Sequence, residues 1–109
     1  MTKISFKEAI KDLDDPWQPK EVAYINDTAL RVAKIHGEYH WHTHSKEDEF
    51  FYVLKGKINI DSENQSIELN EGDGLVVKKG IRHRSRAVKP AWILLVEPIA
   101  TKTKGEEPA

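Results

Sequence analysis

The chain has 109 residues, enough for one hydrophobic core and therefore for a single domain. Its 17 basic and 18 acidic side chains give a formal charge of −1, so neither nucleic acid nor a membrane surface is an expected partner. The absence of cysteine excludes disulfides, thiolate metal ligands and thiol nucleophiles. No apolar run approaches the roughly 18 residues of a membrane span, and the N-terminus lacks the apolar core of a signal peptide, so we expect a cytoplasmic protein.

Residues 1–19 predict a short N-terminal helix followed by an extended arm. Ser5 is placed to cap the helix, and Glu8, three residues later, completes a capping-box pattern. Pro16 and Pro19 end the helical pattern, because proline lacks an amide proton and its ring disfavours helix at the preceding residue.

Short apolar segments separated by turn residues fill residues 20–100. Their recurrence at intervals of about ten residues, with almost no helix between them, is typical of an all-β barrel or sandwich. Residues 101–109 contain no large apolar side chain, which predicts a mobile tail. We expect seven or eight strands, at 21–25, 28–35, 49–54, 57–61, 66–69, 74–77, 83–88 and 91–98.

Side-chain alternation indicates which strand faces are buried. If Glu49 points into the barrel, Phe51 shares its face. Phe50 and Tyr52 then point outward, so this strand is apolar on both faces, and residues 91–96 are apolar on both faces as well. Such strands need cover on both sides, and we therefore expect a homodimer that buries the outer face.

Residues 40–50, HWHTHSKEDEF, hold three of the five histidines in the chain. His40, His42 and His44 occupy alternate positions, so in an extended segment they would share one face. Neutral imidazole is the commonest protein ligand for metals, and Glu49 in the next strand offers an oxygen. This pattern indicates a metal site.

A remote histidine, His83, opens a later strand and would complete the site. Together with His42, His44 and Glu49 it offers three nitrogens and one carboxylate oxygen, which suits one divalent transition metal such as Mn, Fe, Ni, Zn or Co. The alternative is a group of polar residues without a metal, although burying such groups unpaired is costly. His40 would close the site if it were a further ligand, so we expect it near the metal as a catalytic proton carrier.

Two segments of the chain resemble the paired motifs of the cupin superfamily. Residues 37–56 read glycine, a spacer, His-Thr-His, four residues, glutamate, six residues and glycine. Residues 72–87 read glycine, five residues, Lys-Lys-Gly, two residues, histidine, three residues and alanine. Lys78 and Ala87 replace the proline and the asparagine of the second motif, and the first spacer is one residue short. No ligand is lost by these departures.

The resemblance is to small single-domain cupins with a conserved barrel, of the mannose-6-phosphate isomerase-like and RmlC-like type. It implies a double-stranded β-helix, or jelly-roll, over residues 20–100, and a metal inside one mouth held by the four residues above. Lyase, isomerase and dioxygenase activities occur among similar cupins. We therefore expect a metalloenzyme acting on a small polar metabolite. The alternative is a metal-containing binding or sensor module for a sugar or metabolite, without catalysis.

A row of arginines, Arg82, Arg84 and Arg86, could bind an anionic ligand. However, the alternation that turns His83 inward turns these side chains outward, so we expect a solvated or salt-bridged strand face. The aromatic side chains on which nucleic-acid bases stack are absent from this row. Trp41 alternates with the proposed ligands and is expected outside the barrel.

Overall fold

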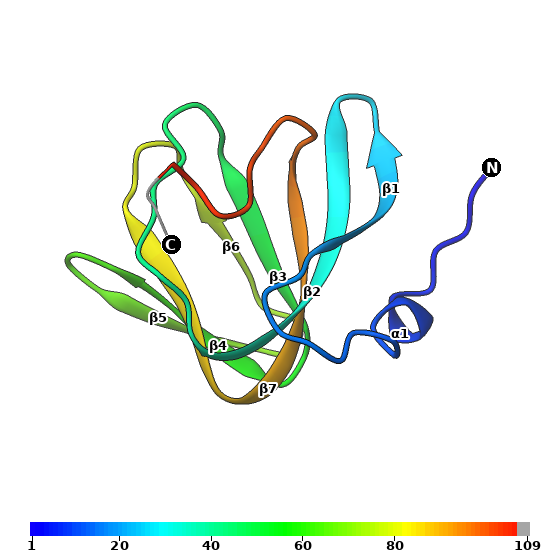
Figure 1. Ribbon diagram of the computed structural model, residues 1–109, viewed down its shortest axis with the longest axis horizontal. Coiled ribbons are helices and arrows are strands. Elements are labelled where there is room, and N and C mark those ends of the chain that lie inside the picture. The colour runs from blue at the N-terminus through cyan, green and yellow to red at the C-terminus, as the bar shows by residue number, and fades with distance from the viewer. Residues whose placement is uncertain (107–109) are drawn as a thin grey trace.

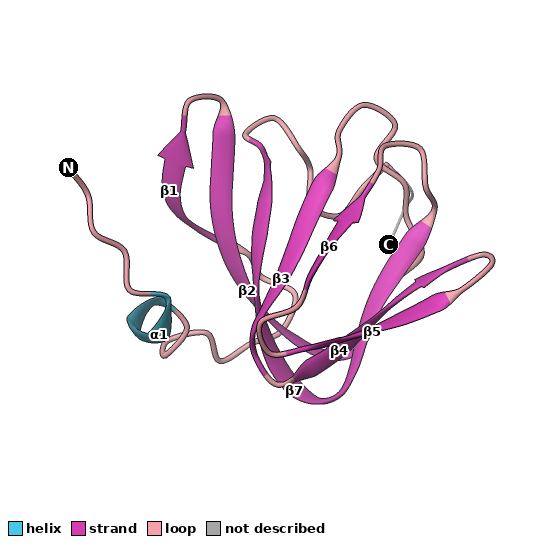
Figure 2. Cartoon of the chain, turned by 180° about the vertical axis from the view of Figure 1, so that it is seen from behind, coloured by secondary structure: helices cyan, strands magenta, loops and turns pink. Residues whose placement is uncertain are grey.

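Seven antiparallel strands form one strongly curved sheet that folds into a barrel, with a short helix outside it (Figures 1 and 2). The computed structural model describes residues 1–106. The expected all-β barrel with an N-terminal helix is confirmed. The helix is α1 Phe6–Ala9, and the strands are β1 Lys20–Ile25, β2 Thr28–Glu38, β3 Glu49–Lys55, β4 Lys57–Ser62, β5 Ser66–Asn70, β6 Gly74–Val77 and β7 His83–Pro98.

The long strand β7 holds the barrel together, because its first part pairs with β4 and with the end of β2, and its second part pairs with β2 and β3. We expected two strands, at 83–88 and 91–98, but the structure has one. Residues 88–90 lie opposite His36 alone in β2, which interrupts the ladder. The strand bends there instead of turning back, as its curved path in Figure 1 shows.

The predicted alternation of buried and exposed side chains is confirmed in β3. Phe51 and Val53 are buried, and they belong to the apolar core that fills the barrel. Phe50 and Tyr52, on the outer face, are only partly buried. The same rule holds in β4 and β5, whose inward residues join the core. That core consists of Ala33, Ile35, Phe51, Val53, Ile58, Ile60, Leu69, Val77, Ala87, Ala91, Ile93 and Leu95.

The N-terminal helix is shorter than its apolar pattern suggests. Ser5 caps it as expected, since its Oγ accepts a hydrogen bond from the backbone N–H of Glu8 at 3.3 Å. The carboxylate of Glu8 pairs with Lys11 at 3.0 Å. The arm that follows α1 reaches the barrel at Trp17. There the backbone N–H of Trp17 donates to the carbonyl of Lys34 at 3.0 Å. No helix in the described chain is long and apolar enough to cross a membrane.

The described part of the tail, residues 101–106, makes defined contacts with the barrel. It runs from the end of β7 across the open end of the barrel toward the segment between β2 and β3 (red in Figure 1). Polar contacts replace the missing apolar anchor. Thr101 is buried, its carbonyl accepts from Arg31 at 2.9 Å, and the N–H of Glu106 donates to the carbonyl of Thr43 at 3.0 Å. Residues 107–109 of the expected tail lie outside the described residues.

Candidate metal centre

The structure brings the four predicted ligands together. One ligand atom from each of His42, His44, Glu49 and His83 lies within 4.8 Å of the corresponding atoms of the others, and all four residues are at most 3% exposed. We call this group the His₃Glu cluster. Its position in the fold follows from local structure, because Glu49 begins β3 and His83 begins β7.

The histidine segment is extended but does not form a full strand. A single antiparallel bridge joins it to β7, where the backbones of His42 and His83 exchange two hydrogen bonds of 2.9 Å. The alternation inferred from the sequence nevertheless holds, since His42 and His44 are buried whereas Trp41 and Thr43 are only partly buried. The bridge places His42 directly beside His83.

Backbone carbonyls orient two of the three imidazoles. The Nδ1 atom of His42 donates to the carbonyl of His40 at 3.0 Å, and Nδ1 of His83 donates to the carbonyl of Ile81 at 2.8 Å. Because a carbonyl can only accept, Nδ1 carries the proton in each ring and the lone pair remains on Nε2. This is the tautomer that a metal ligand needs.

Three polar atoms of the cluster face a common point. Nε2 of His44 and Nε2 of His83 lie 3.0 and 3.2 Å from Oε1 of Glu49. All three atoms are buried, and no hydrogen-bond partner for them exists among residues 1–106. Unpartnered buried polar atoms are costly, and a divalent cation between them would satisfy all three. The donor set therefore fits a divalent transition metal.

The electrostatics of the cluster favour the metal-binding protonation state in His42 and Glu49, and oppose it in His44. Burial, reinforced by the nearby charge of His83, lowers the pKa of His42 to about 4, although its backbone hydrogen bond opposes the shift. Burial would raise the pKa of Glu49, but the adjacent imidazoles of His44 and His83 outweigh it and lower that pKa. For His44, burial is outweighed by Glu49, which raises the pKa of the ring. Near neutral pH, His42 is thus neutral and Glu49 is ionised.

A second buried carboxylate, Glu97, lies beside Glu49 and was missed by the sequence reasoning. Its Oε1 accepts from Nη1 of Arg31 at 2.7 Å and from the hydroxyl of Thr103 at 3.0 Å. Burial and the neighbouring charge of Glu49 raise the pKa of Glu97. Side-chain alternation could have revealed this pair. Arg31 lies two residues before the inward residue Ala33 and so shares its face, and a charged side chain on the inner face needs a buried partner.

His40, the predicted proton carrier, is not part of the His₃Glu cluster. Its Nε2 donates to the carbonyl of Lys104 at 2.9 Å, and its ring centroid lies 5.3 Å from that of His42. The tail continues over the cluster, since Gly105 packs against His42 and the carboxylate of Glu106 accepts from the backbone N–H of Ser45 at 3.0 Å. His40 therefore contacts the C-terminal tail, which lies over the site.

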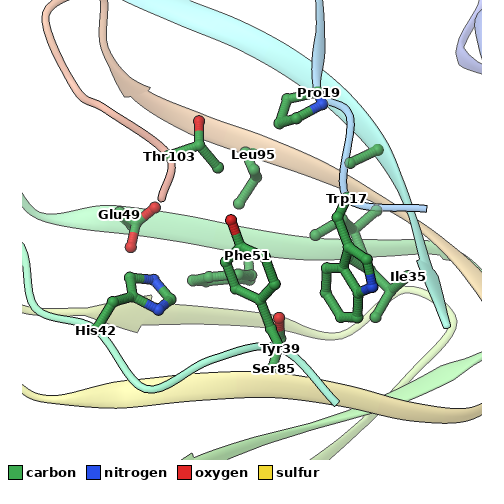
Figure 3. Close-up of a pocket in the computed structure, with 12 residues that line it drawn as sticks. Trp17, Pro19, Ile35, Tyr39, His42, Glu49, Phe51, Ser85, Leu95 and Thr103 are labelled. Carbon is green, nitrogen blue, oxygen red and sulfur yellow. The ribbon is translucent and has the colours of Figure 1, made fainter. Parts of the chain in front are cut away.

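A small cavity of about 30 Å³ adjoins the cluster at His42 and Glu49. Figure 3 shows His42 and Glu49 at one end of it and Trp17 at the other, with Tyr39 between them. Burial, together with the charge of Glu49, raises the pKa of Tyr39. The lining residues are Trp17, Pro19, Ala33, Ile35, Tyr39, His42, Glu49, Phe51, Ser85, Ile93, Leu95 and Thr103.

The arginine row is a salt-bridged outer face, as predicted. Asp61 accepts from Nε of Arg84 at 3.0 Å and from Nε of Arg86 at 2.7 Å, and these arginines lower its pKa to about 2. The guanidinium groups of Arg82 and Arg84 lie 5.1 and 5.0 Å from the ring centroid of Trp41. These side chains therefore stand outside the barrel, away from the cluster.

A jelly-roll barrel with three buried histidines and one glutamate at its mouth defines the class of cupin-type barrels. Comparison with known proteins agrees, because the model of the cupin domain, Cupin_2, matches residues 30–97. The chain belongs to the cupin superfamily, as a small single-domain member.

Individual relatives show the same relationship. YdbB of Bacillus subtilis (strain 168) is 38% identical over 77 residues, which are 70% of this chain and 68% of that protein. The crystal structure of a cupin-2 domain containing protein from Shewanella frigidimarina NCIMB 400 has a TM-score of 0.85 at 33% identity, and the match covers 87% of this chain and 93% of that one. Polyketide synthase CurC of Streptomyces cyaneus is 30% identical over 64 residues, which are 56% of this chain and 42% of that protein.

Proposed function

We propose that this cupin is a metalloenzyme that acts on a small molecule through one divalent transition metal held by the His₃Glu cluster. The observation that supports this most is the convergence of three buried polar atoms that have no hydrogen-bond partner in the described chain, on His44, Glu49 and His83. A divalent ion supplies Lewis acidity, which lowers the pKa of a group that coordinates it. A lyase, isomerase or dioxygenase type of reaction would use this property.

The chain itself orients the ligands and excludes water. The carbonyls of His40 and Ile81 fix the rings of two histidines, and Glu97 contacts Glu49. The tail covers the barrel mouth, so the cluster is enclosed. The cavity lined by His42 and Glu49 leaves room for another molecule next to the cluster, and a second cavity reaches His83 from the side of β4 and β6. A metal that serves structure alone would need no such room.

The second candidate is a metal-containing binding or sensor module for a small molecule, without catalysis. The covered mouth favours it, because a tail held over the site would slow release of whatever is bound. The similarity to CurC, which is named a polyketide synthase, favours an enzyme. A search for a co-purified small molecule, followed by incubation with the metal-loaded protein, separates the two. Recovery of the molecule unchanged supports the binding module, and conversion to a product supports the enzyme.

Metal content tests the cluster directly. Elemental analysis should find about one transition-metal ion per chain in the wild type and little in His42→Ala or His83→Ala. His36→Ala is the matched control, because His36 is an exposed histidine of β2 outside the cluster. It should keep the full content. Equal metal loss in His36→Ala, or equal retention in His42→Ala, would contradict the proposed site.

A further inference from the structure

We infer that the molecule that reaches the His₃Glu cluster is small, planar and largely apolar, with its oxygen donors on one edge, and that Trp17 is the residue that selects it. Aromatic or enolic compounds have this chemistry. The inference rests on the proposed metal function and names its ligand class. It differs from the polar metabolite expected from the sequence, and the reason lies in the walls of the cavity.

Most of the cavity wall cannot satisfy a polyhydroxylated ligand. Apart from His42, Glu49 and the hydroxyl-bearing residues Tyr39, Ser85 and Thr103, the wall is made largely of carbon surface, to which Ile35, Phe51 and Leu95 contribute. The hydroxyl of Thr103, which also lines the cavity, already donates to Glu97. A sugar brings several hydroxyl groups, and each one buried without a partner costs about 1–3 kcal/mol. An apolar body gains instead from leaving water.

The apolar surface is also flat in the direction that leads away from the cluster. The rings of Trp17 and Tyr39 stack with centroids 4.6 Å apart and an angle of 18° between their planes. Tyr39 meets His42 edge-on at 5.4 Å, and Phe51 meets His83 edge-on at 6.1 Å. Aromatic walls of this kind favour planar ligands, because ring pairs gain beyond the area they bury. The wall therefore continues from the ligands of the metal to Trp17 (Figure 3).

The backbone conformation of Trp17 is unfavourable for a tryptophan, which indicates that the indole has a role beyond forming the turn. Its φ is +66°, in the left-handed region, where a bulky side chain is uncommon. The turn at Pro16 and Trp17 would be satisfied better by glycine or asparagine. A strained residue of this type costs on the order of 1–3 kcal/mol and persists where its surroundings hold it. Here the strain places an indole at the cavity end opposite Glu49 (Figure 3).

The arm that carries Trp17 must also move when a ring enters. The cavity of about 30 Å³ holds little more than a water molecule, whereas an engineered cavity that binds benzene has roughly 150 Å³. Trp17 belongs to no helix or strand, and its segment crosses the barrel end before β1 begins. Outward movement of Trp17 would enlarge the cavity and leave the indole against the ligand.

Two hydroxamates provide the test, because acetohydroxamate and benzohydroxamate offer the same pair of oxygen donors and differ by a phenyl ring. Their affinities for the metal-loaded protein would be measured by isothermal titration calorimetry, after elemental analysis has established the metal content. The wild type should bind benzohydroxamate at least about tenfold more tightly than acetohydroxamate. Trp17→Ala should bring that ratio close to one and leave the affinity for acetohydroxamate unchanged. Trp17→Phe should retain part of the preference.

Trp41→Ala is the matched control, since Trp41 lies on the outer face under Arg82 and Arg84 and should keep the wild-type ratio. Full metal content with equal affinities for the two probes in the wild type would overturn the ligand class. A preference retained in Trp17→Ala, with the fold verified by circular dichroism, would overturn the role of Trp17. A wild type that binds no metal would overturn the proposed function itself, and this inference with it.

Discussion

Gly105 packs so tightly on His42 that a β-carbon on the glycine would lie 2.7 Å from the Cβ and Cδ2 atoms of the histidine. The φ of Gly105 is +77°, which a residue with a side chain adopts only with strain. The contact joins the last described segment of the chain to the first ligand of the cluster, so the two should respond together to substitution.

Gly105→Ala should release the tail from the barrel mouth. The β-carbon would overlap His42, and the left-handed backbone adds strain of about 1 kcal/mol. We expect trypsin to cleave after Lys102 and Lys104 several-fold faster than in the wild type, and a chelator to strip metal faster. Gly72→Ala is the control, because Gly72 has a φ of +86° but open space around it. If both variants behave alike, the contact with His42 does not hold the tail.

Metal affinity should fall on acidification, since protons compete with the metal for the imidazoles. His44, whose pKa is raised, takes up its proton first, so the affinity should begin to fall at or above the usual histidine range of ~6.5. His42, with a pKa of about 4, adds its own dependence only near that pH. Titration against a competing chelator from pH 8 to pH 4 would show this. Full metal retention at pH 4 would contradict the ligand set.

Glu97→Ala should destabilise the fold, because it removes the buried carboxyl partner of Arg31, which is 8% exposed and keeps only Glu21 and two backbone carbonyls. Leaving a buried polar group short of a hydrogen-bond partner costs about 1–3 kcal/mol. Glu21→Ala removes the other, half-exposed carboxylate partner of Arg31, at 3.3 Å, and should cost less than about 1 kcal/mol. Urea denaturation would compare the two. Equal effects would show that Glu97 is not the essential partner.

His40 remains the proposed proton carrier, although its Nε2 is occupied by the carbonyl of Lys104. His40→Ala should keep the metal and lower turnover of the substrate by about 10²-fold, the usual contribution of a general acid or base. Because the same change loosens the tail, His40→Gln is the informative companion, since its amide can still donate to Lys104. Wild-type turnover in His40→Gln would assign His40 to holding the tail and not to proton transfer.

We propose a homodimer that covers the outer face of the sheet. Paired outward residues form a row across four strands: Val76 in β6 lies opposite Phe50 in β3, which lies opposite Val96 in β7, which lies opposite Leu30 in β2. Val76 is 54% exposed. Light scattering should give twice the chain mass of 12.5 kDa. Val76→Lys should yield monomers, whereas Val88→Lys, at an exposed site on the bend of β7, should not. A wild-type mass of 12.5 kDa at micromolar concentration would contradict the dimer.

Local pattern was sufficient to predict the four clustered residues. Alternation fixes the faces of His42, His44 and Glu49 within a short stretch, and His83 follows from the second motif. Alternation also predicted the buried face of β3 and the outward arginines. Apart from His83, which the resemblance to the second motif supplied, these features depend on neighbours close in the chain, so periodicity carries the information. The expected pair of strands at 83–88 and 91–98 differed from the single β7 because a bend and a turn have similar residue signals.

Only the tertiary structure decided what surrounds the cluster. Arg31 meets Glu97 because β2 pairs with β7. The tail reaches His42 because the carbonyl of Thr43 accepts from the N–H of Glu106 and the imidazole of His40 donates to the carbonyl of Lys104. Trp17 arrives from the opposite end of the chain through a strained turn. Contacts of this kind join segments distant in sequence, and no local periodicity encodes them. The sequence by itself therefore determined which residues converge, whereas the packing of the arm and the tail decided how that site is enclosed and what can enter it.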